Sequence, residues 1–264
     1  MLLYQMSFVI AFSGKGGTGK TTLCALTIRF LIEKRRGPVL AVDADSNSCL
    51  NDALGVEVHA TVGRLREQSL QTIRAGDERP GGMSMEQLFD YQIQQCLVEA
   101  KGFDLLVMGR PEGPGCYCAA NNIIRKYTDR LSEHYPYVVI DNEAGMEHLS
   151  RRTTHNVDIL FIVSDATKKG ILTAKRINEL VDELSLSVKD RYLIINRVAT
   201  VTSPPEEIES LLQLATEAGL KVAGWLPADP LIEEYDLKGI PVVKLPESSL
   251  LLKNFYQILN SLIN

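Results

Sequence analysis

Short apolar runs alternate along this chain with longer stretches in which apolar residues recur at helical spacing. The short runs are almost continuously apolar, which is typical of strands covered on both faces in a parallel sheet. Six strands are predicted on this basis, at residues 8–13, 38–43, 104–109, 137–142, 159–165 and 192–197, and a weaker seventh at 220–227. The intervening patterns predict helices at residues 19–35, 84–100, 119–133, 170–186, 205–218 and 248–263.

This alternation predicts an α/β fold, a doubly wound and mostly parallel sheet flanked by helices. The sequence shows no internal repeat and no long linker, so residues 1–264 are expected to form a single domain. Ser84 and Gln87 have the spacing of a capping box at the start of the helix at 84–100. Residues 74–84 are rich in turn-forming types and are expected to form a surface loop.

Composition narrows the class of protein. The chain has 28 Lys and Arg against 33 Asp and Glu, a net charge of −5, so its bulk charge favours neither nucleic acid nor a membrane as partner. It has no run of about 20 apolar residues, as a membrane span needs, and its start lacks the basic region of a signal peptide. Five cysteines, an odd number in a long chain, favour a reducing, cytoplasmic location over a disulfide framework.

The strongest chemical signal is the string GKGGTGKT at residues 14–21, which follows a predicted strand and opens a predicted helix. It contains the phosphate-loop pattern in Gly14, Gly19, Lys20 and Thr21. The glycines let backbone N–H groups turn inward around phosphate oxygens, and the helix dipole adds to the attraction. Lys20 is expected to reach the β- and γ-phosphates of ATP, and Thr21 to place its hydroxyl on Mg²⁺. The other expected nucleotide-binding residues here are Lys15, Gly16, Gly17, Thr18 and Thr22.

An ordinary phosphate loop does not need the second lysine, Lys15. With it, the string resembles the deviant Walker A loop of the family that contains the cell-division-site ATPase MinD, chromosome-partition ATPases, the arsenite-pump ATPase and the nitrogenase iron protein. Two subunits of that family meet face to face over nucleotide, and the early lysine crosses to the partner's phosphates. The resemblance implies a homodimeric ATPase that binds ATP or ADP, with Lys15 and Lys20 in catalytic roles.

Two predicted strands lead into aspartates, at the edge where ligands bind in open α/β sheets. Asp43 and Asp45 resemble the first switch of the family, which implies that Asp45 orients or activates the attacking water and that Asp43 supports Mg²⁺ through water. Capping of the following helix is the alternative role for either, since Ser46 and Asn47 suit a turn. Asp141 resembles the Walker B aspartate, which implies that it holds a water bound to Mg²⁺.

Two later segments resemble the part of the family that contacts the base. Asn196 and Arg197 end the strand predicted at 192–197, and the family uses such an asparagine to recognise the adenine edge. Pro227 and Asp229 lie in the string WLPADP, which resembles the loop that closes over the base. Each signal is short, and its order after the phosphate loop gives it weight.

A C-x-C pair, Cys116 and Cys118, lies in a stretch rich in glycine and proline. In extended backbone, residues i and i+2 project to the same side, so both thiolates can face one ion at about 2.3 Å. Soft-metal sites usually have four ligands, and a two-fold dimer supplies the second pair by bringing like loops together. Four thiolates suit tetrahedral Zn²⁺ or square-planar Ni²⁺. The alternative is two ordinary reduced cysteines, although exposed thiols invite oxidation.

The strings GRPEGPGCYC and EAGMEHLSRRT together resemble the CooC-type ATPases that mature nickel enzymes. The resemblance implies a homodimer that binds one nickel ion between two C-x-C pairs and couples it to nucleotide state. The implied client is carbon monoxide dehydrogenase or acetyl-CoA synthase. Glu143, Glu147 and His148 keep open roles, as partner contacts, an extra metal ligand or structural residues.

Two other functions compete with nickel insertion. An electron-transfer ATPase like the nitrogenase iron protein carries a cysteine shortly after the Walker B aspartate, where this chain has His148 and no cysteine. A positioning ATPase that binds membrane carries a basic amphipathic C-terminal helix. Residues 248–264 contain one lysine, so this segment is expected to pack on the sheet. The sequence therefore favours a partner that is neither membrane nor nucleic acid.

Overall fold

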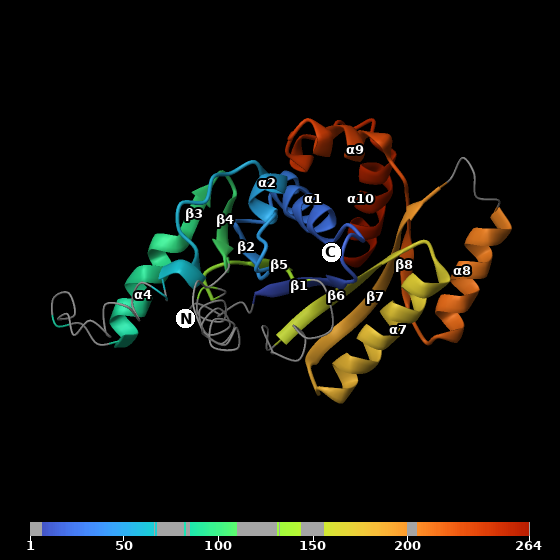
Figure 1. The fold of residues 1–264 in the computed structure, drawn as a ribbon, viewed down its shortest axis with the longest axis horizontal. Coiled ribbons are helices and arrows are strands. Elements are labelled where there is room, and N and C mark those ends of the chain that lie inside the picture. Colours follow the sequence, from blue (N-terminus) through green and yellow to red (C-terminus); the bar gives the residue numbers. More distant parts are fainter. Residues whose placement is uncertain are drawn as a thin grey trace.

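The computed structural model describes residues 7–65, 67, 82, 85–109, 131, 133–143, 156–199 and 205–263. These residues build one eight-stranded sheet in the order β3-β4-β2-β5-β1-β6-β7-β8 (Figure 1). Every pairing is parallel except that of β3 with β4. The strands are β1 (Phe8–Gly14), β2 (Val39–Asp43), β3 (Leu97–Ala100), β4 (Phe103–Val107), β5 (Tyr137–Asp141), β6 (Asn156–Asp165), β7 (Ser187–Val198) and β8 (Val222–Pro227).

Helices cover both faces of the sheet, with α1 and α10 on one side and α7 and α8 on the other (Figure 1). The predicted mostly parallel α/β fold is therefore confirmed. That residues 1–264 form a single domain stays a prediction. The helices are α1 (Lys20–Glu33), α2 (Leu50–Leu54), α4 (Met85–Cys96), α7 (Lys168–Glu183), α8 (Pro205–Glu217), α9 (Pro230–Leu237) and α10 (Leu250–Leu262), with a 3-10 turn, η2 (Val242–Lys244).

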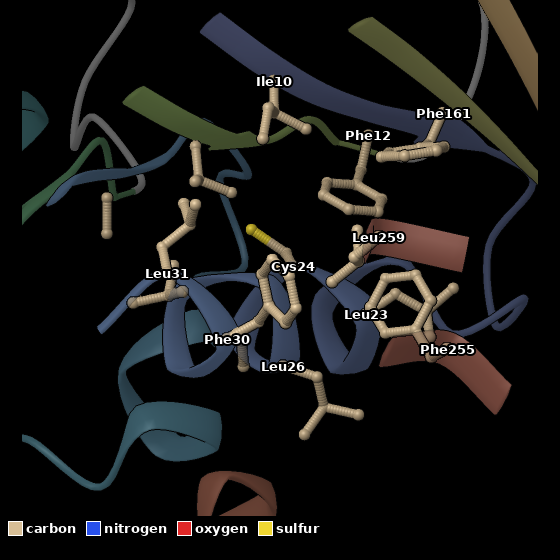
Figure 2. Close-up of a cluster of buried hydrophobic side chains, with 14 of the residues drawn as sticks. Ile10, Phe12, Leu23, Cys24, Leu26, Phe30, Leu31, Phe161, Phe255 and Leu259 are labelled. Carbon is tan, nitrogen blue, oxygen red and sulfur yellow. The ribbon is translucent and has the colours of Figure 1, made fainter. Parts of the chain in front are cut away.

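The core between the sheet and α1 is aromatic at its centre. Phe12 of β1 and Phe161 of β6 stack with their ring centroids 5.2 Å apart. Leu23 of α1 and Phe255 and Leu259 of α10 are buried in the same cluster (Figure 2). Because burial of each such side chain contributes about 1.5–3 kcal/mol, this cluster fixes α1, and with it the loop that precedes α1, against the carboxyl end of β1.

The predicted helix at 84–100 is wrong in its last four residues. Helix α4 ends at Cys96, and Leu97–Ala100 form the antiparallel strand β3, with Val98 opposite Leu105 of β4. The chain reverses at Gly102, whose φ of 90° lies in the left-handed region that glycine adopts without strain. The two-residue turn lets β3 pair with β4, and this pairing overrides the helical pattern.

Other predicted elements differ in extent or lie outside the described residues. The helix predicted at 170–186 ends earlier, at Glu183, and the positive φ of 51° at Ser185 interrupts it before β7 begins at Ser187. The short helices α2 and α9 were not predicted. Ser84, most of the loop at 74–84 and most of the helix at 119–133 lie outside the described residues.

The parallel strands bring the candidate site residues to one edge of the sheet. Asp43 at the end of β2 lies opposite Asp141 at the end of β5, and Asp141 also lies opposite Phe12 of β1. On the other side of β1, Asp165 of β6 lies opposite Asn196 of β7. None of the helices in the described part of the chain is long and apolar enough to cross a membrane.

Candidate nucleotide-binding site

The loop between β1 and α1 forms a cradle of backbone groups. Gly14, Gly17 and Gly19 have φ values of 154°, 79° and 97°. A side chain at Gly19 would place its Cβ 2.4 Å from Nδ2 of Asn196, so the loop needs glycine there for space as well as for conformation. The N–H groups of Gly16, Gly17 and Gly19 donate to no residue that the structure describes. Backbone N–H groups without a described acceptor, just before a helix N-terminus, fit a phosphate.

The two loop lysines are placed differently. Lys20 is buried, with 7% of its surface exposed, and its Nζ donates to the carbonyl oxygen of Lys15 at 3.3 Å. Burial lowers the pKa of Lys20, while the nearby charges of Asp141 and Asp45 oppose the shift. The side chain of Lys15 is exposed. Lys20 thus points into the cradle, and the Lys15 side chain is available to a second molecule.

Thr21 and Asp141 form a candidate cation site. The Thr21 hydroxyl donates to Oδ2 of Asp141 at 2.6 Å. The other oxygen, Oδ1, is buried and accepts no hydrogen bond from any described residue. A buried carboxylate oxygen without a partner is costly, and a hydrated Mg²⁺ beside a hydroxyl and a carboxylate is the ligand that such a pair suits. The residues therefore fit Mg²⁺ at the predicted place.

Burial also perturbs both aspartates that meet across β2 and β5. It raises the pKa of Asp141 to about 7; the hydrogen bond from Thr21 opposes the shift and the charge of Asp43 adds to it. It raises the pKa of Asp43 to about 6, against the effect of the backbone N–H groups that donate to this carboxylate. Two carboxylates held together in the interior favour the approach of a cation.

The segment after β2 uses its aspartates as hydrogen-bond acceptors. Asp43 accepts from the backbone N–H groups of Cys49 and Leu50 at the start of α2, at 3.1 Å each, and from that of Asp45 at 3.0 Å. Asp45 accepts from the N–H of Asn47 at 2.8 Å. The capping alternative thus describes the contacts of Asp43, whereas Asp45 accepts from a turn residue that precedes α2. The roles of Asp43 toward Mg²⁺ and of Asp45 toward water stay predictions.

Asn196 joins the phosphate loop to the end of β7. Its Nδ2 donates to the carbonyl oxygen of Thr18 at 2.8 Å, and its Oδ1 accepts from the N–H of Arg197 at 2.9 Å. Arg197 has a φ of 61°, rare for a residue other than glycine, and the bond from Asn196 supports this conformation. The described contacts of Asn196 thus connect the phosphate loop to the end of β7. Its recognition of adenine stays a prediction.

Beside the cradle lies a cavity of about 330 Å³ that combines both predicted base-binding segments. Gly19 and Thr22 line it from the phosphate loop, and Asn196 and Arg197 from the end of β7. Pro227, Ala228 and Asp229 line the side formed by β8 and the start of α9. Sequence reasoning missed a further lining residue, Glu233 of α9, because the short helix that positions it was not predicted.

Some predicted residues cannot be placed. Cys116, Cys118, Glu147 and His148 lie outside the described residues. Glu143 is described, and its Oε1 accepts from the Ser46 hydroxyl at 3.2 Å. Within the described ranges, no group of three or more His, Cys, Asp or Glu side chains is arranged to hold a metal ion.

Comparison with models of protein families shows which family the chain belongs to. The model of the CobQ/CobB/MinD/ParA nucleotide-binding domain matches residues 9–242. The chain belongs to this family. The match runs from β1 to η2 and so includes the loop, both aspartate-ending strands and the lining of the 330 Å³ cavity apart from Leu251. As a family member, the chain has a P-loop nucleotide-binding fold.

Individual relatives cover nearly the whole chain. An uncharacterised ATP-binding protein of Methanocaldococcus jannaschii is 48% identical over 97% of this chain and 98% of its own length. The carbon monoxide dehydrogenase accessory protein CooC of Rhodospirillum rubrum is 30% identical over 88% of each chain. The solved structure of the septum site-determining protein MinD of Pyrococcus horikoshii, in complex with Mg-ADP, matches with a TM-score of 0.68 at 21% identity, covering 98% of this chain and 97% of that one.

Proposed function

We propose that this family member is an ATPase whose nucleotide state controls a nickel site, and that it delivers Ni²⁺ to the active-site cluster of carbon monoxide dehydrogenase or acetyl-CoA synthase. The observation that carries the nucleotide part is the buried, unpartnered Oδ1 of Asp141 beside Thr21, at the rim of the glycine cradle. The C-x-C string supports the nickel part, as does the 30% identity to an accessory protein named for carbon monoxide dehydrogenase.

In this proposal the described residues divide the work on ATP. Lys20 neutralises the β- and γ-phosphates inside the cradle, where burial strengthens its charge interactions. Thr21 and Asp141 would hold Mg²⁺, which offsets negative charge on the phosphates when bound. Asp45 orients the attacking water. The exposed Lys15 completes the site of a second subunit, so hydrolysis requires the homodimer.

Nickel is the cargo of the cycle. ATP closes the homodimer, and closure brings two C-x-C pairs, each Cys116 and Cys118, to one Ni²⁺ or, in its place, Zn²⁺. Hydrolysis reopens the pair beside the client enzyme. Because thiolates bind the metal, nickel binding is expected to release protons and to weaken as the pH falls.

Metal titration tests the nickel assignment. Wild-type protein with a non-hydrolysable ATP analogue is expected to bind about one Ni²⁺ per two chains, as four thiolates from two subunits require. The double variant Cys116→Ala/Cys118→Ala should lose this binding. Cys49→Ala is the matched control, because Cys49 is exposed and lies outside the C-x-C pair. Equal nickel stoichiometry in wild type and double variant contradicts the assignment.

The structural match to MinD favours one competitor, a positioning ATPase. That function predicts ATP-dependent binding to anionic vesicles or DNA at physiological salt, which a sedimentation assay measures. An iron-protein-like function predicts a brown protein, reducible after anaerobic purification. Nickel binding that depends on Cys116 and Cys118, without either of these properties, separates the proposed function from both.

A further inference from the structure

The cavity beside the phosphate loop contains both satisfied and unsatisfied polar groups. Its polar lining side chains are those of Thr22, Asn196, Arg197, Asp229 and Glu233. A group that is already hydrogen-bonded within the protein stabilises the cavity wall, whereas an acceptor or donor without a partner is available to a ligand. The hydrogen bonds that each lining side chain already makes therefore indicate which of them can recognise a ligand in the cavity.

Asp229 has little left to offer a ligand. It caps α9: its Oδ1 accepts from the N–H of Leu231 at 3.0 Å. Its Oδ2 accepts from the Ser249 hydroxyl at 2.7 Å and from the N–H of Leu251 at 3.3 Å, which ties α9 to the start of α10. Both oxygens thus fix the first turn of α9, the turn that contains Glu233.

Asn196 is also largely used. Its Oδ1 accepts from the N–H of Arg197, and one hydrogen of its Nδ2 is given to Thr18. One N–H of Nδ2 and one lone pair of Oδ1 remain, so Asn196 offers a ligand one donor and one neutral acceptor. A charged acceptor for a ligand donor has to come from another side chain of this cavity.

Glu233 supplies a charged acceptor, and it is the carboxylate of this lining that the described residues leave unpaired. It is exposed at the cavity, and its carboxylate makes no hydrogen bond or ion pair with any residue that the structure describes. The adjacent Glu234 differs, since it does not line the cavity and its Oε1 pairs with Nζ of Lys238 at 2.6 Å. Two neighbouring glutamates on one short helix thus have distinct surroundings.

We propose that Glu233 selects the base of the nucleotide, by accepting a hydrogen bond from the 6-amino group of adenine. This inference rests on the proposed nucleotide function of the same site. Adenine presents an amino donor at position 6, whereas guanine and hypoxanthine present a carbonyl oxygen there. An oxygen at position 6 would face the carboxylate acceptor with no hydrogen between them, so six-oxo purines are rejected.

Binding of ADP and of inosine diphosphate, measured by calorimetry, tests this role, because the two bases differ at position 6 and in the protonation of N1. Wild type is expected to bind ADP at least about tenfold more tightly, since a hydrogen bond to a charged group is lost with the inosine base. In Glu233→Gln the ratio should fall to about twofold, because a carboxamide both accepts and donates. Glu233→Lys should invert the preference. Glu234→Gln, with the same charge change, should keep the wild-type ratio.

The outcomes separate this inference from the proposed function. A wild type that binds neither nucleotide contradicts both. A wild type that binds ADP and inosine diphosphate equally, or a Glu233→Gln variant that keeps the full ratio, overturns the role of Glu233 and leaves nucleotide binding intact. Thermal melting of each variant confirms that the fold is unchanged.

Discussion

The phosphate end and the base end of the site are built in different ways. At the phosphate end, Lys20 and Asp141 are buried, and one short loop supplies the cradle. At the base end, Asp229 and Glu233 come from a short helix that forms one wall of a cavity, and Glu233 is exposed. Burial makes each polar group at the first end energetically costly, whereas water competes at the second. Substitutions should therefore act on affinity and stability at the phosphate end and on selectivity at the base end.

Removal of the buried lysine should give the largest effect. Lys20→Ala is expected to weaken ADP binding by at least about 100-fold, because it deletes a charge-assisted contact to phosphate inside the cradle. Lys15→Ala is the matched control, because the loop contacts use the carbonyl oxygen of Lys15 and not its side chain. The affinity of this variant for ADP should stay within about threefold of the wild-type value. Calorimetric titration with ADP measures both, and equal losses in the two variants would refute the distinction.

Alanine substitutions at two glycines of the same loop should lower the free energy of unfolding by different amounts. Gly19→Ala is expected to destabilise the protein by about 3 kcal/mol, because its Cβ would meet Nδ2 of Asn196 at 2.4 Å in a left-handed backbone. Gly17→Ala, which has no atom within 4 Å of its Cβ, should cost only the strain, about 1 kcal/mol. Urea unfolding compares them, and similar costs would mean that the contact with Asn196 adds nothing.

The buried aspartate should destabilise the metal-free protein at high pH. The folded pKa of Asp141, about 7, exceeds its ordinary value of 3.8, so the stability that protonation contributes is complete below about pH 4 and is lost as the pH rises through 7. Asp43, Asp45 and Lys20 face the same group. Asp141→Asn, which keeps an acceptor for Thr21, should raise the free energy of unfolding by about 2 kcal/mol near pH 8. Denaturation at several pH values without Mg²⁺ measures this, and an unchanged pH profile would be evidence against the assigned pKa.

The smallest effect belongs to the base end. Glu233→Gln should lower the ratio of ADP to inosine diphosphate affinity from about tenfold to about twofold. It should alter stability very little, because the side chain is exposed. If Glu233→Gln lowered the free energy of unfolding as much as Gly19→Ala does, the contrast between the phosphate end and the base end of the site would be refuted.

The sequence predicted the phosphate end better than the base end, for physical reasons. Near-continuous apolarity located the strands, and the loop string between β1 and α1 carries its own geometry in its glycines. The base end depends on contacts between segments far apart in sequence, such as Asp229 with Ser249. Glu233 sits on a helix of eight residues, too short for a periodic signal. Strand β3 was missed for a similar reason, because pairing with β4 outweighed local preference.

The contacts of Asn196 and Asp229 illustrate the same limit. The resemblance to the family assigned both residues to the base, and the cavity does include them. The residue type alone does not tell whether an amide or carboxylate bonds to the protein around the cavity or to a ligand in it. Here Asn196 makes one hydrogen bond each with Thr18 and Arg197, and Asp229 makes one each with Leu231, Ser249 and Leu251.

Nickel stoichiometry in different nucleotide states tests the proposed coupling between the nucleotide site and nickel. Equilibrium dialysis of wild type and Lys15→Ala against Ni²⁺, with a non-hydrolysable ATP analogue, with ADP and without nucleotide, is the measurement. We expect about one Ni²⁺ per two chains for wild type with the analogue, as four thiolates require, and much less in every other combination. Nickel binding that is the same in all nucleotide states, and unaffected by Lys15→Ala, would contradict it.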